Sequence, residues 1–385
     1  MQQIREENCT RSLQPAGTTR EQRGGDGRFP REGRPTSAPD ISIEDVIGYE
    51  ALWEAMLKCR LGVMWKASVA SFVLNGAENV SKLCDELHDG TYRPRSPSHF
   101  TVTYPKRREI VGISFRDRVY QRSLNDNCVY PIMSRSWIRD NYACQAGKGT
   151  DDGRARFKCF LGRHYREHGA EGWVLSIDVR GYYANMRHDL VEALFREKLP
   201  PWAAEMAVGV LRSQYPGEVG YNPGSQIVQI AGVSLLSGVD HYAKERLGLR
   251  HYGRYMDDIK VVHRDRARLE RCRDEIGAQL ARIGLELHPR KTVIRPVTAC
   301  TPFLGFDFRL TRTGKALMTV RPENVKAMRR RISRLTALEA RGLRPPGTAA
   351  EAYEGWRAHA EKGDSRRLIE RCDKWFAETR GETWK

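Results

Sequence analysis

The residues best suited to do chemistry are two adjacent acids, Asp257 and Asp258. They separate two strand-like runs in RHYGRYMDDIKVVHR, residues 250–264. Neighbouring carboxylates repel each other unless a cation compensates their charge, so the pattern is typical of a cation-binding hairpin. A solvent-exposed hairpin turn containing Asp is the alternative, and it needs no ligand. The two acids alone do not decide between these interpretations.

A third acid favours the cation. Asp178 ends the apolar run WVLSID, residues 173–178, and so lies at a second predicted strand edge. Three carboxylates at two strand edges can hold two Mg²⁺ ions, which prefer oxygen ligands. Two such ions roughly 3.5–4 Å apart stabilise the attacking and the leaving oxygen of a phosphoryl transfer. We therefore predict a metal site formed by these acids.

Strands that alternate with helices are predicted to position the acids. Strand-like runs occur early in residues 93–130 and at residues 173–178, 250–264 and 299–320, the last range holding two strands. Helical periodicity indicates two helices in residues 41–90 and further helices at residues 115–126, 189–212, 265–283 and 321–385. This order predicts an α+β fold with a helical appendage at its C-terminal end.

The charge of the chain points to a polyanionic partner. Lys and Arg number 65 and Asp and Glu number 48, which gives a net charge of +17. Residues 1–40, rich in Gly, Pro, Ser and Thr, are predicted to be a disordered leader, and they carry only +1 of this charge. The surplus therefore belongs to the folded part, and nucleic acid is the most common partner of such a surplus.

The sequence also predicts where the protein works. It contains no run of about 18 apolar residues and no apolar signal segment, so neither a membrane span nor secretion is expected. The nine cysteines are scattered and include no C-x-x-C pair, which is typical of a reducing compartment. We expect a cytoplasmic protein with no membrane partner.

Seven short motifs occur in a fixed order over roughly residues 90–310. They are YPKRREIVGISFRDRVYQRSL, DNYACQAGKGT, SIDVRGYYANM, NPGSQIVQ, RYMDD, GLELHPRKT and FLGF. In this order the chain resembles prokaryotic reverse transcriptases of the retron, group II intron and diversity-generating type, in particular their compact free-standing bacterial group. The resemblance implies a right-hand polymerase with fingers, a ferredoxin-like antiparallel palm and a helical thumb. The corresponding ranges are a leader at 1–40, N-terminal helices and fingers at 41–172, the palm at 173–318 and the thumb at 319–385.

The resemblance assigns the residues of the reaction centre. Asp178, Asp257 and Asp258 would bind two Mg²⁺ ions, with Mn²⁺ as a substitute, and the backbone carbonyl of Val179 would help. Asp258 ranks as the less direct ligand. Lys291, in HPRKT, would protonate the leaving pyrophosphate, and an ordinary surface lysine is the alternative.

The resemblance also implies a nucleotide site. Lys106 and Arg108 would clasp the incoming triphosphate, where cations neutralise the leaving group, unless they belong to an exposed basic hairpin. Tyr183 would lie under the sugar and exclude a 2′-hydroxyl, unless it is a core tyrosine. Gln229 would contact the nascent base pair or cap a helix.

Two further segments would hold nucleic acid. Gly305 and Phe306 would belong to the hairpin that holds the primer end. Arg329, Arg330 and Arg334 would bind the RNA–DNA hybrid, since a merely solvated helix face usually mixes charges of both signs.

The implied function is that of an RNA-directed DNA polymerase. It would add dNTPs to a DNA or RNA primer on an RNA template, in a diversity-generating or an antiphage defence setting. A non-templated polymerase or an RNA-binding scaffold on the same fold is the alternative, and the presence of all three acids favours activity. The sequence does not identify an accessory protein.

Two remaining patterns are predicted to have no catalytic role. AGKGT lacks the G-x-x-x-x-G-K-[ST] spacing of a phosphate-binding loop, so we expect a flexible basic turn against the template. His164 and His168 are four residues apart but lack the acid of a zinc-binding H-E-x-x-H motif, so we expect surface histidines.

Overall fold

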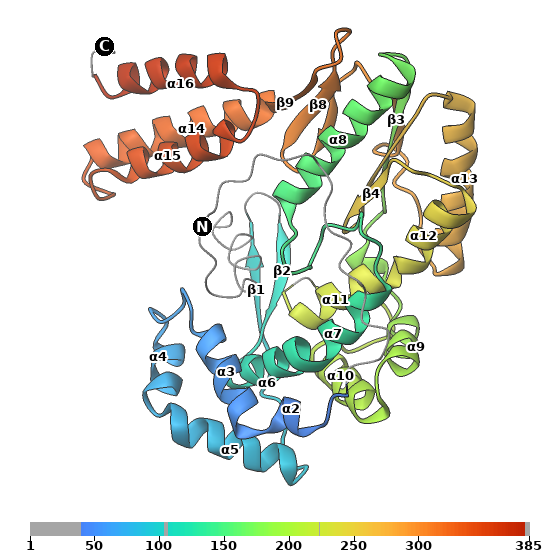
Figure 1. Ribbon diagram of the computed structural model, residues 1–385. Helices are drawn as coiled ribbons and strands as arrows, with labels where there is room; N and C mark the ends of the chain where they lie inside the picture. The colour runs from blue at the N-terminus through green and yellow to red at the C-terminus, as the bar shows by residue number, and fades with distance from the viewer. Residues whose placement is uncertain (1–39, 104–106, 223, 382–385) are drawn as a thin grey trace, which may run out of the picture. The chain divides into compact units, whose positions relative to one another are not determined.

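The computed structural model describes residues 40–103, 107–222 and 224–381 (Figure 1). The chain is divided into two compact units. Unit one contains the described residues within 1–149, 179–247 and 276–287, and unit two those within 150–178, 248–275 and 288–385. In the described residues, no helix has both the length and the apolar character that a membrane span requires.

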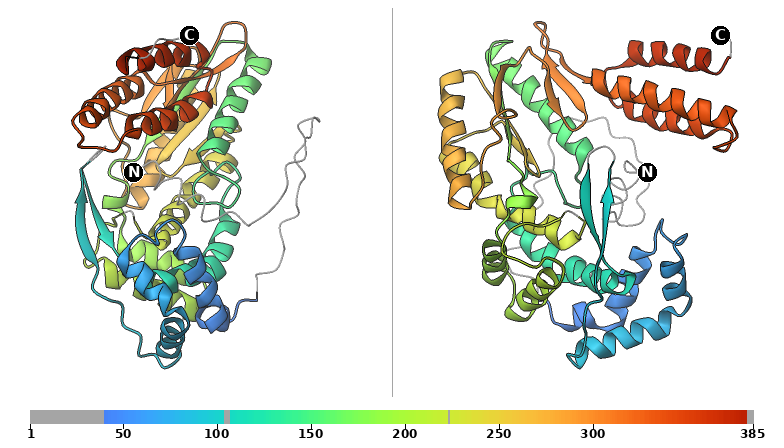
Figure 2. Two further views of the ribbon diagram at one scale, coloured as in Figure 1. Left: turned by 90° about the vertical axis from the view of Figure 1, so that its left-hand side faces the viewer. Right: turned by 180° about the vertical axis from the view of Figure 1, so that it is seen from behind.

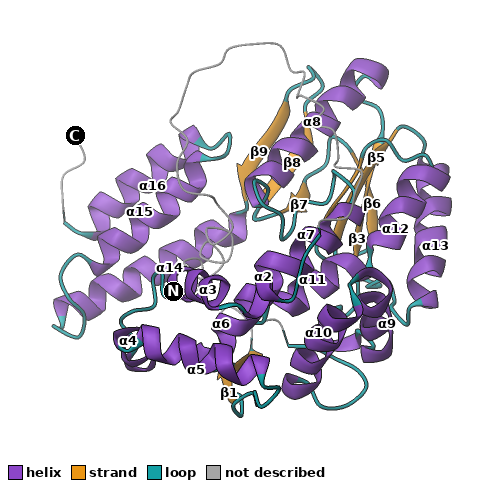
Figure 3. Cartoon of the chain, turned by 60° about the horizontal axis from the view of Figure 1, so that its bottom comes forward, coloured by secondary structure: helices purple, strands orange, loops and turns teal. Residues whose placement is uncertain are grey.

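Unit one is mainly helical. Its helices are α2 (Glu44–Ile47), α3 (Tyr49–Cys59), α4 (Ala67–Leu74), α5 (Gly76–His88), α6 (Phe115–Leu124), α7 (Tyr130–Met133), α9 (His188–Lys198), α10 (Pro201–Gln214), α11 (Gln226–Leu235) and α12 (Ser237–His241). Two π-helical turns (Asn125–Val129, Tyr242–Arg246) and two 3-10 turns (Ser134–Ser136, Tyr183–Asn185) connect them. Helices α2, α3 and α6 pack together around fully buried Leu52 and Val119 (Figure 3).

Two helical predictions in unit one were too coarse. Residues 41–90 form four helices rather than two. The backbone is extended at Gly48, turns at Gly62 with a φ of 70°, and leaves the helical conformation again at Asn75. Residues 189–212 form two helices, α9 and α10. The break falls at Pro200 and Pro201, because proline lacks the amide hydrogen that a helix interior needs.

Unit one also holds the predicted short strands of residues 93–130. Strands β1 (Ser98–Val102) and β2 (Arg108–Gly112) pair in antiparallel fashion, with Val102 opposite Arg108. The helix α6 follows directly, and Ser114 caps it by accepting a hydrogen bond from the Asp117 amide.

The centre of unit two is a four-stranded antiparallel sheet of β3 (Trp173–Asp178), β4 (Tyr252–Tyr255), β5 (Asp258–His263) and β6 (Val293–Pro296). The strand order is β4-β5-β3-β6, and α13 (Arg266–Arg282) follows β5. This order and the β-α-β-β-α-β connectivity are ferredoxin-like. Strand β3 is apolar because it is one of the two inner strands of the sheet. Its Leu175 and Ile177 are completely buried.

A second antiparallel sheet contains three strands where two were expected. They are β7 (Thr301–Phe303), β8 (Phe306–Leu310) and β9 (Ala316–Val320), in that order. The long helix α8 (Thr150–His168) packs against β4 and β5 of the first sheet and against β8 and β9 of the second (Figure 2). Phe157 of α8 contacts the rings of Phe303 and Phe308 with centroid distances of 5.4 and 5.1 Å.

Helix α8 corrects the prediction for His164. The side chain is fully buried rather than on the surface, because the face of α8 that carries it is turned into the unit. Its Nε2 lies 2.7 Å from the Glu171 carbonyl, a distance that satisfies one ring nitrogen. Within AGKGT, Ala146 and Gly147 form a turn, as predicted, and Thr150 begins α8.

The C-terminal part of unit two is a bundle of α14 (Pro322–Ala340), α15 (Thr348–Glu361) and α16 (Arg366–Thr379) (Figure 1). Its core includes Met328, Ile332 and Tyr353. The loop before α16 ties the bundle to the free edge of β9. Asp364 Oδ2 accepts from the Met318 amide at 3.0 Å, and Ser365 Oγ accepts from the Val320 amide at 3.1 Å. These bonds satisfy an edge that would otherwise be open.

Candidate active site

The strand register brings three acids to one end of the first sheet in unit two. Asp178 is the last residue of β3 and lies directly opposite Asp258, the first residue of β5. Asp257 precedes it in the turn between β4 and β5. Like charges directly opposite each other destabilise an antiparallel pair unless other groups compensate them. This end of the sheet therefore requires cations.

The turn that carries Asp257 has a strained backbone. Met256 has a φ of 53°, the left-handed region that two-residue hairpin turns normally reserve for glycine or asparagine. Arg254 is completely buried below the turn, and its Nη1 donates to the Met256 carbonyl at 2.9 Å. Strain of this kind persists where the surrounding structure imposes it, and it is concentrated at functional sites.

Two lysines provide the compensating charge. The Nζ of Lys291 lies 3.0 Å from both carboxylate oxygens of Asp178. Lys260 is 95% buried and forms an ion pair with Asp258. The two residues are two positions apart on β5, so their side chains share one face of the strand. Its ammonium group also lies 5.3 Å from the ring centroid of Phe303. Two of the three carboxylates are thus paired, while Asp257 sits between like charges.

The electrostatic result is greatest at Asp257. Burial, followed by the like charges of Asp178 and Asp258, raises the pKa of Asp257 to about 6. Burial also raises the pKa of Asp258, although Lys260 opposes that shift. These buried carboxylates carry more negative charge than the neighbouring lysines neutralise. Such a site favours the binding of a cation.

The donor chemistry fits Mg²⁺. Within the described ranges, no three His, Cys, Asp or Glu side chains converge closely enough to hold a metal ion. The carboxylates of Asp178 and Asp258 instead face Lys291 and Lys260. Oxygen-only donors with an uncompensated carboxylate match the preference of Mg²⁺. Metal binding would require the two lysines to give up these ion pairs.

Val179 directly follows the last residue of β3, Asp178. It forms an isolated antiparallel bridge with Leu287. The Arg180 amide donates to Glu286 at 2.8 Å and the His288 amide donates to Asp178 at 2.7 Å. These two bonds flank Val179 and do not use its carbonyl oxygen, the atom predicted to assist the metal.

Tyr183 and Tyr182 lie in unit one, where their burial differs. Tyr182 is 97% buried, and its hydroxyl donates to the Gly232 carbonyl. Tyr183 is half-buried in a 3-10 turn. A Cβ at position 232 would lie 3.2 Å from the Tyr183 ring, so glycine there leaves room for both rings. The side chain with the more open surface is the one predicted to face a sugar.

The other predicted nucleotide residues also belong to unit one. Lys106 lies outside the described residues. Arg108 is the first residue of β2. Gln229 is half-buried in α11, and its Oε1 lies 3.6 Å from the Cys144 sulfur. It lies in the body of the helix rather than at its N-cap, which is Ser225.

Gly305 and Phe306 belong to the tight hairpin between β7 and β8 in unit two. Leu304 and Gly305 both have positive φ, at 45° and 86°. The Phe306 side chain is completely buried. The guanidinium of Arg154, on α8, lies 4.8 Å from the Phe306 ring centroid, and the ring centroid of His359, on α15, lies 4.6 Å from it. Any contact with a primer would therefore use the backbone of the turn rather than the Phe306 side chain.

Arg154 fixes this turn from α8. Its Nε donates to the Leu304 carbonyl at 2.9 Å, and its Nη1 donates to Asp151 at 2.6 Å. Asp151 also accepts from Lys362 at 2.9 Å, just beyond α15. One buried arginine thus joins the start of α8, the β7–β8 turn and the helical bundle.

The three predicted thumb arginines lie on α14, and their roles divide. All three side chains are exposed. Arg330 and Arg334 continue a row that starts at Lys326, at i, i+4 spacing on one face of the helix. Arg329 lies on a different side, with its guanidinium 5.2 Å from the Trp375 ring centroid of α16. Part of Arg329 therefore serves packing within the bundle.

Sequence reasoning missed Lys260, Arg254 and Arg154. Lys260 carried a usable signal, because residues two apart on a strand share a face and it follows Asp258 by two. Arg254 and Arg154 carried none that local patterns reveal. Arg154 meets Leu304 across 150 positions of chain.

The raised pKa of Asp257 yields a prediction about stability. With metal removed by EDTA at about pH 7.5, Asp257→Asn should stabilise the fold by on the order of 1–3 kcal/mol, since ionising Asp257 opposes folding. The folded state binds the proton more tightly than the unfolded state, so the advantage should shrink as pH falls through about 6 toward 5.

Thermal melts of the two proteins across this pH range are the measurement. Asp274→Asn, at an exposed acid of α13, is the matched control and should show no such trend. Added Mg²⁺ should stabilise the wild type more than Asp257→Asn. If Asp257→Asn were less stable than the wild type at every pH, the conclusion that negative charge is in excess at Asp257 would be wrong.

The chain matches the model of one known protein family. The family model described as "Reverse transcriptase (RNA-dependent DNA polymerase)" matches residues 104–308, more than half of the chain. The match includes all three acids, Lys291 and the β7–β8 turn. No curated protein matches the chain. The family implies a palm, fingers and thumb fold, with which the antiparallel sheets and helices agree. The chain belongs to the reverse transcriptase family and is a nucleotidyltransferase, an RNA-directed DNA polymerase.

Proposed function

We propose that the protein extends a DNA or RNA primer on an RNA template by two-metal phosphoryl transfer, with Asp178, Asp257 and Asp258 as the ligands. The observation that carries the proposal is the register of β3 and β5, which gathers the three carboxylates at one sheet end. The raised pKa of Asp257 supports it, because the charge there exceeds what the two lysines compensate.

When bound, two Mg²⁺ ions, or Mn²⁺, would supply charge stabilisation for the attacking and the leaving oxygen. Asp178 and Asp257 would hold them directly, with Asp258 as the less direct ligand and the Val179 carbonyl as an additional donor. Lys291 would then leave Asp178, and its Nζ would donate a proton to the pyrophosphate. Its position 3.0 Å from Asp178 supports this role, because it is already beside the reaction centre.

On the nucleotide side, we assign Lys106 and Arg108 to the triphosphate, Tyr183 to the sugar and Gln229 to the nascent base pair. The half-buried Tyr183 beside fully buried Tyr182 supports the sugar assignment, because only a partly open ring can meet a substrate. The other three assignments rest on the motif resemblance.

On the nucleic-acid side, we assign the backbone of the Gly305–Phe306 turn to the primer end. Arg330 and Arg334, with a smaller part for Arg329, would contact the RNA–DNA hybrid. Their position on the exposed face of α14 supports this, because phosphate contacts need accessible cations. We retain the division into fingers at 41–172, palm at 173–318 and thumb at 319–385.

We further propose a prokaryotic setting, in which the enzyme serves diversity generation or antiphage defence in the cytoplasm. The Gln-containing GSQIVQ motif supports the diversity-generating side. No disulfide joins the eight cysteines of the described ranges, which supports a reducing compartment. The genes that neighbour the coding sequence would distinguish the two settings. A non-templated polymerase or a scaffold is not favoured by any feature of the site.

The first test of this function is the loss of a metal ligand. Asp178→Asn should reduce extension of a DNA primer on an RNA template by at least roughly 10²–10³-fold, because a site for charge developing in the transition state is lost. Extension with Mg²⁺ and dNTPs is measured alongside thermal melts, with Asp274→Asn as the surface control. Near wild-type extension by folded Asp178→Asn would show that the metal assignment is wrong.

The second test concerns sugar choice. Tyr183→Ala should raise ribonucleotide incorporation relative to deoxynucleotide by about 5- to 150-fold, since an uncompensated 2′-hydroxyl costs on the order of 1–3 kcal/mol. Competition of each dNTP with its rNTP on a primed RNA template measures the ratio. Tyr182→Phe is the control, because it removes only the bond to the Gly232 carbonyl and should affect stability rather than selectivity. An unchanged ratio for Tyr183→Ala would move sugar selection elsewhere.

A further inference from the structure

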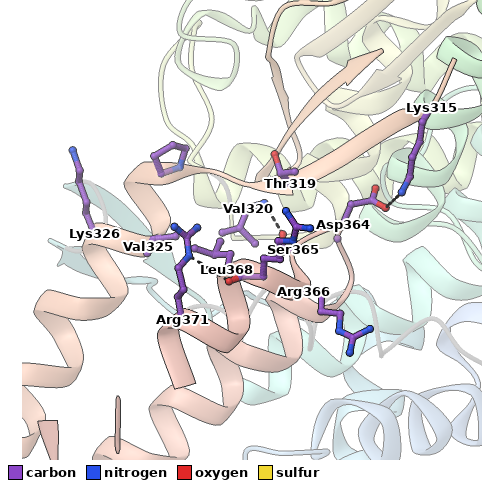
Figure 4. Close-up of a pocket in the computed structure, with 13 residues that line it drawn as sticks. Lys315, Thr319, Val320, Val325, Lys326, Asp364, Ser365, Arg366, Leu368 and Arg371 are labelled. Atoms are coloured by element: carbon purple, nitrogen blue, oxygen red, sulfur yellow. Dashed lines mark hydrogen bonds and ion pairs between the residues drawn. The ribbon is translucent and has the colours of Figure 1, made fainter. Parts of the chain in front are cut away.

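A groove of about 890 Å³ lies in unit two between β9, the start of α14 and the start of α16 (Figure 4). Its middle is formed by Val325, Leu368 and Ser365. The Ser365 hydroxyl already accepts the Val320 amide, and the Met318 amide is taken by Asp364. The edge of β9 is therefore not open to an added strand.

The rim of the groove carries a strong excess of positive charge. Five cations and one acid line it: Lys315, Lys326, Arg366, Arg367 and Arg371, with Asp364. Lys315 lies 3.7 Å from Asp364, and Arg366 lies 3.1 Å from Glu370. No carboxylate of the described residues forms an ion pair with the remaining three cations. Gathering unpaired cations around one hollow is unfavourable unless an anion binds there.

We propose that this groove binds the phosphodiester backbone of single-stranded RNA, outside the reaction centre. Arginine is the side chain best suited to phosphate, because its planar donors match two phosphate oxygens at once. Three of the five cations are arginines from the first turns of α16. Without an aromatic side chain among its lining residues, the groove is expected to bind with little preference for sequence.

An acidic protein segment fits the groove less well. A helix that docks in a groove needs exposed apolar surface for its anchor residues. Val320 is 95% buried, and Val325 and Leu368 are half-buried. None of them is among the large exposed hydrophobic side chains of the described residues. The available attraction is therefore mainly electrostatic, which favours a polyanion.

The groove is continuous with the cation row on α14. Lys326 lines the groove and also begins the row that continues through Arg330 and Arg334. If that row holds the hybrid, as the proposed function states, a strand that leaves the hybrid can pass directly into the groove. The unpaired part of the template and a separate RNA molecule share the required chemistry, and the experiment distinguishes them.

The test uses the full chain and the double variant Arg367→Gln/Arg371→Gln. Fluorescence anisotropy measures Kd for three labelled probes over a range of KCl: a blunt RNA–DNA hybrid, the same hybrid with a single-stranded RNA template overhang, and an unstructured RNA of about 15 nucleotides. For the free RNA, Kd should rise roughly tenfold at physiological salt and the slope of log K against log salt should fall by about 1.4. The overhang hybrid should show the same change if the template is the occupant, and no change if a separate RNA is.

Two matched variants complete the design. Arg264→Gln/Arg271→Gln removes the same charge from two exposed positions, one just before α13 and one in its second turn. This variant should leave all three Kd values near wild type. Arg367→Lys/Arg371→Lys keeps the charge and should preserve most of the salt slope. Circular dichroism melts confirm that each variant is folded. Because binding needs no catalysis, the result is independent of whether primer extension succeeds.

Three outcomes would overturn the proposal. One is a groove variant that binds both RNA single strands like the wild type. A second is a loss confined to the blunt hybrid, which would make the groove part of the duplex site. The third is unchanged RNA binding together with weakened binding of a labelled polyglutamate peptide, which would make the groove a docking site for acidic protein segments.

Discussion

Repulsion among Asp178, Asp257 and Asp258 is the interaction on which the rest of the structure depends. The register of β3 and β5 sets two of the charges directly opposite each other, and the strained turn at Met256 adds the third. Such an arrangement opposes folding unless it is compensated. Buried Lys260, exposed Lys291 and the bond from Arg254 to the turn provide that compensation. The fold thus maintains an excess of negative charge at one sheet end, where a divalent cation would be stabilised.

The second sheet of unit two also contributes to the environment of these carboxylates. Lys260 lies between Asp258 and the Phe303 ring, so β7 helps to desolvate the site. Arg154 on α8 fixes the next turn through the Leu304 carbonyl and is itself held by Asp151. Positive charge is displayed elsewhere, on the exposed face of α14 and around the groove at α16. Excess negative charge and excess positive charge are thus displayed on separate elements of one unit.

Much of this arrangement follows from local sequence patterns. The apolar run that ends in Asp178, the hairpin around Asp257 and the amphipathic helix after it are all present as predicted. The helix α8 was not predicted, although Phe157, Phe160 and Leu161 have helical spacing. His164 was misplaced on the surface, because its burial depends on the packing of α8 against the two sheets. Lys260 could have been found from the two-residue period of a strand. Arg154 could not, since its partners at Leu304 and Phe306 are set by tertiary packing alone.

The claim that these three carboxylates form a divalent metal site can be measured without any nucleic acid. Fe²⁺ bound in place of Mg²⁺, with ascorbate and peroxide, generates hydroxyl radicals that cut the nearby backbone. The cuts should fall beside Asp178 and within the turn at Met256–Asp258, should be suppressed by added Mg²⁺, and should disappear in Asp257→Asn. Cuts that fall elsewhere in the chain, or that persist unchanged in Asp257→Asn, would contradict the account.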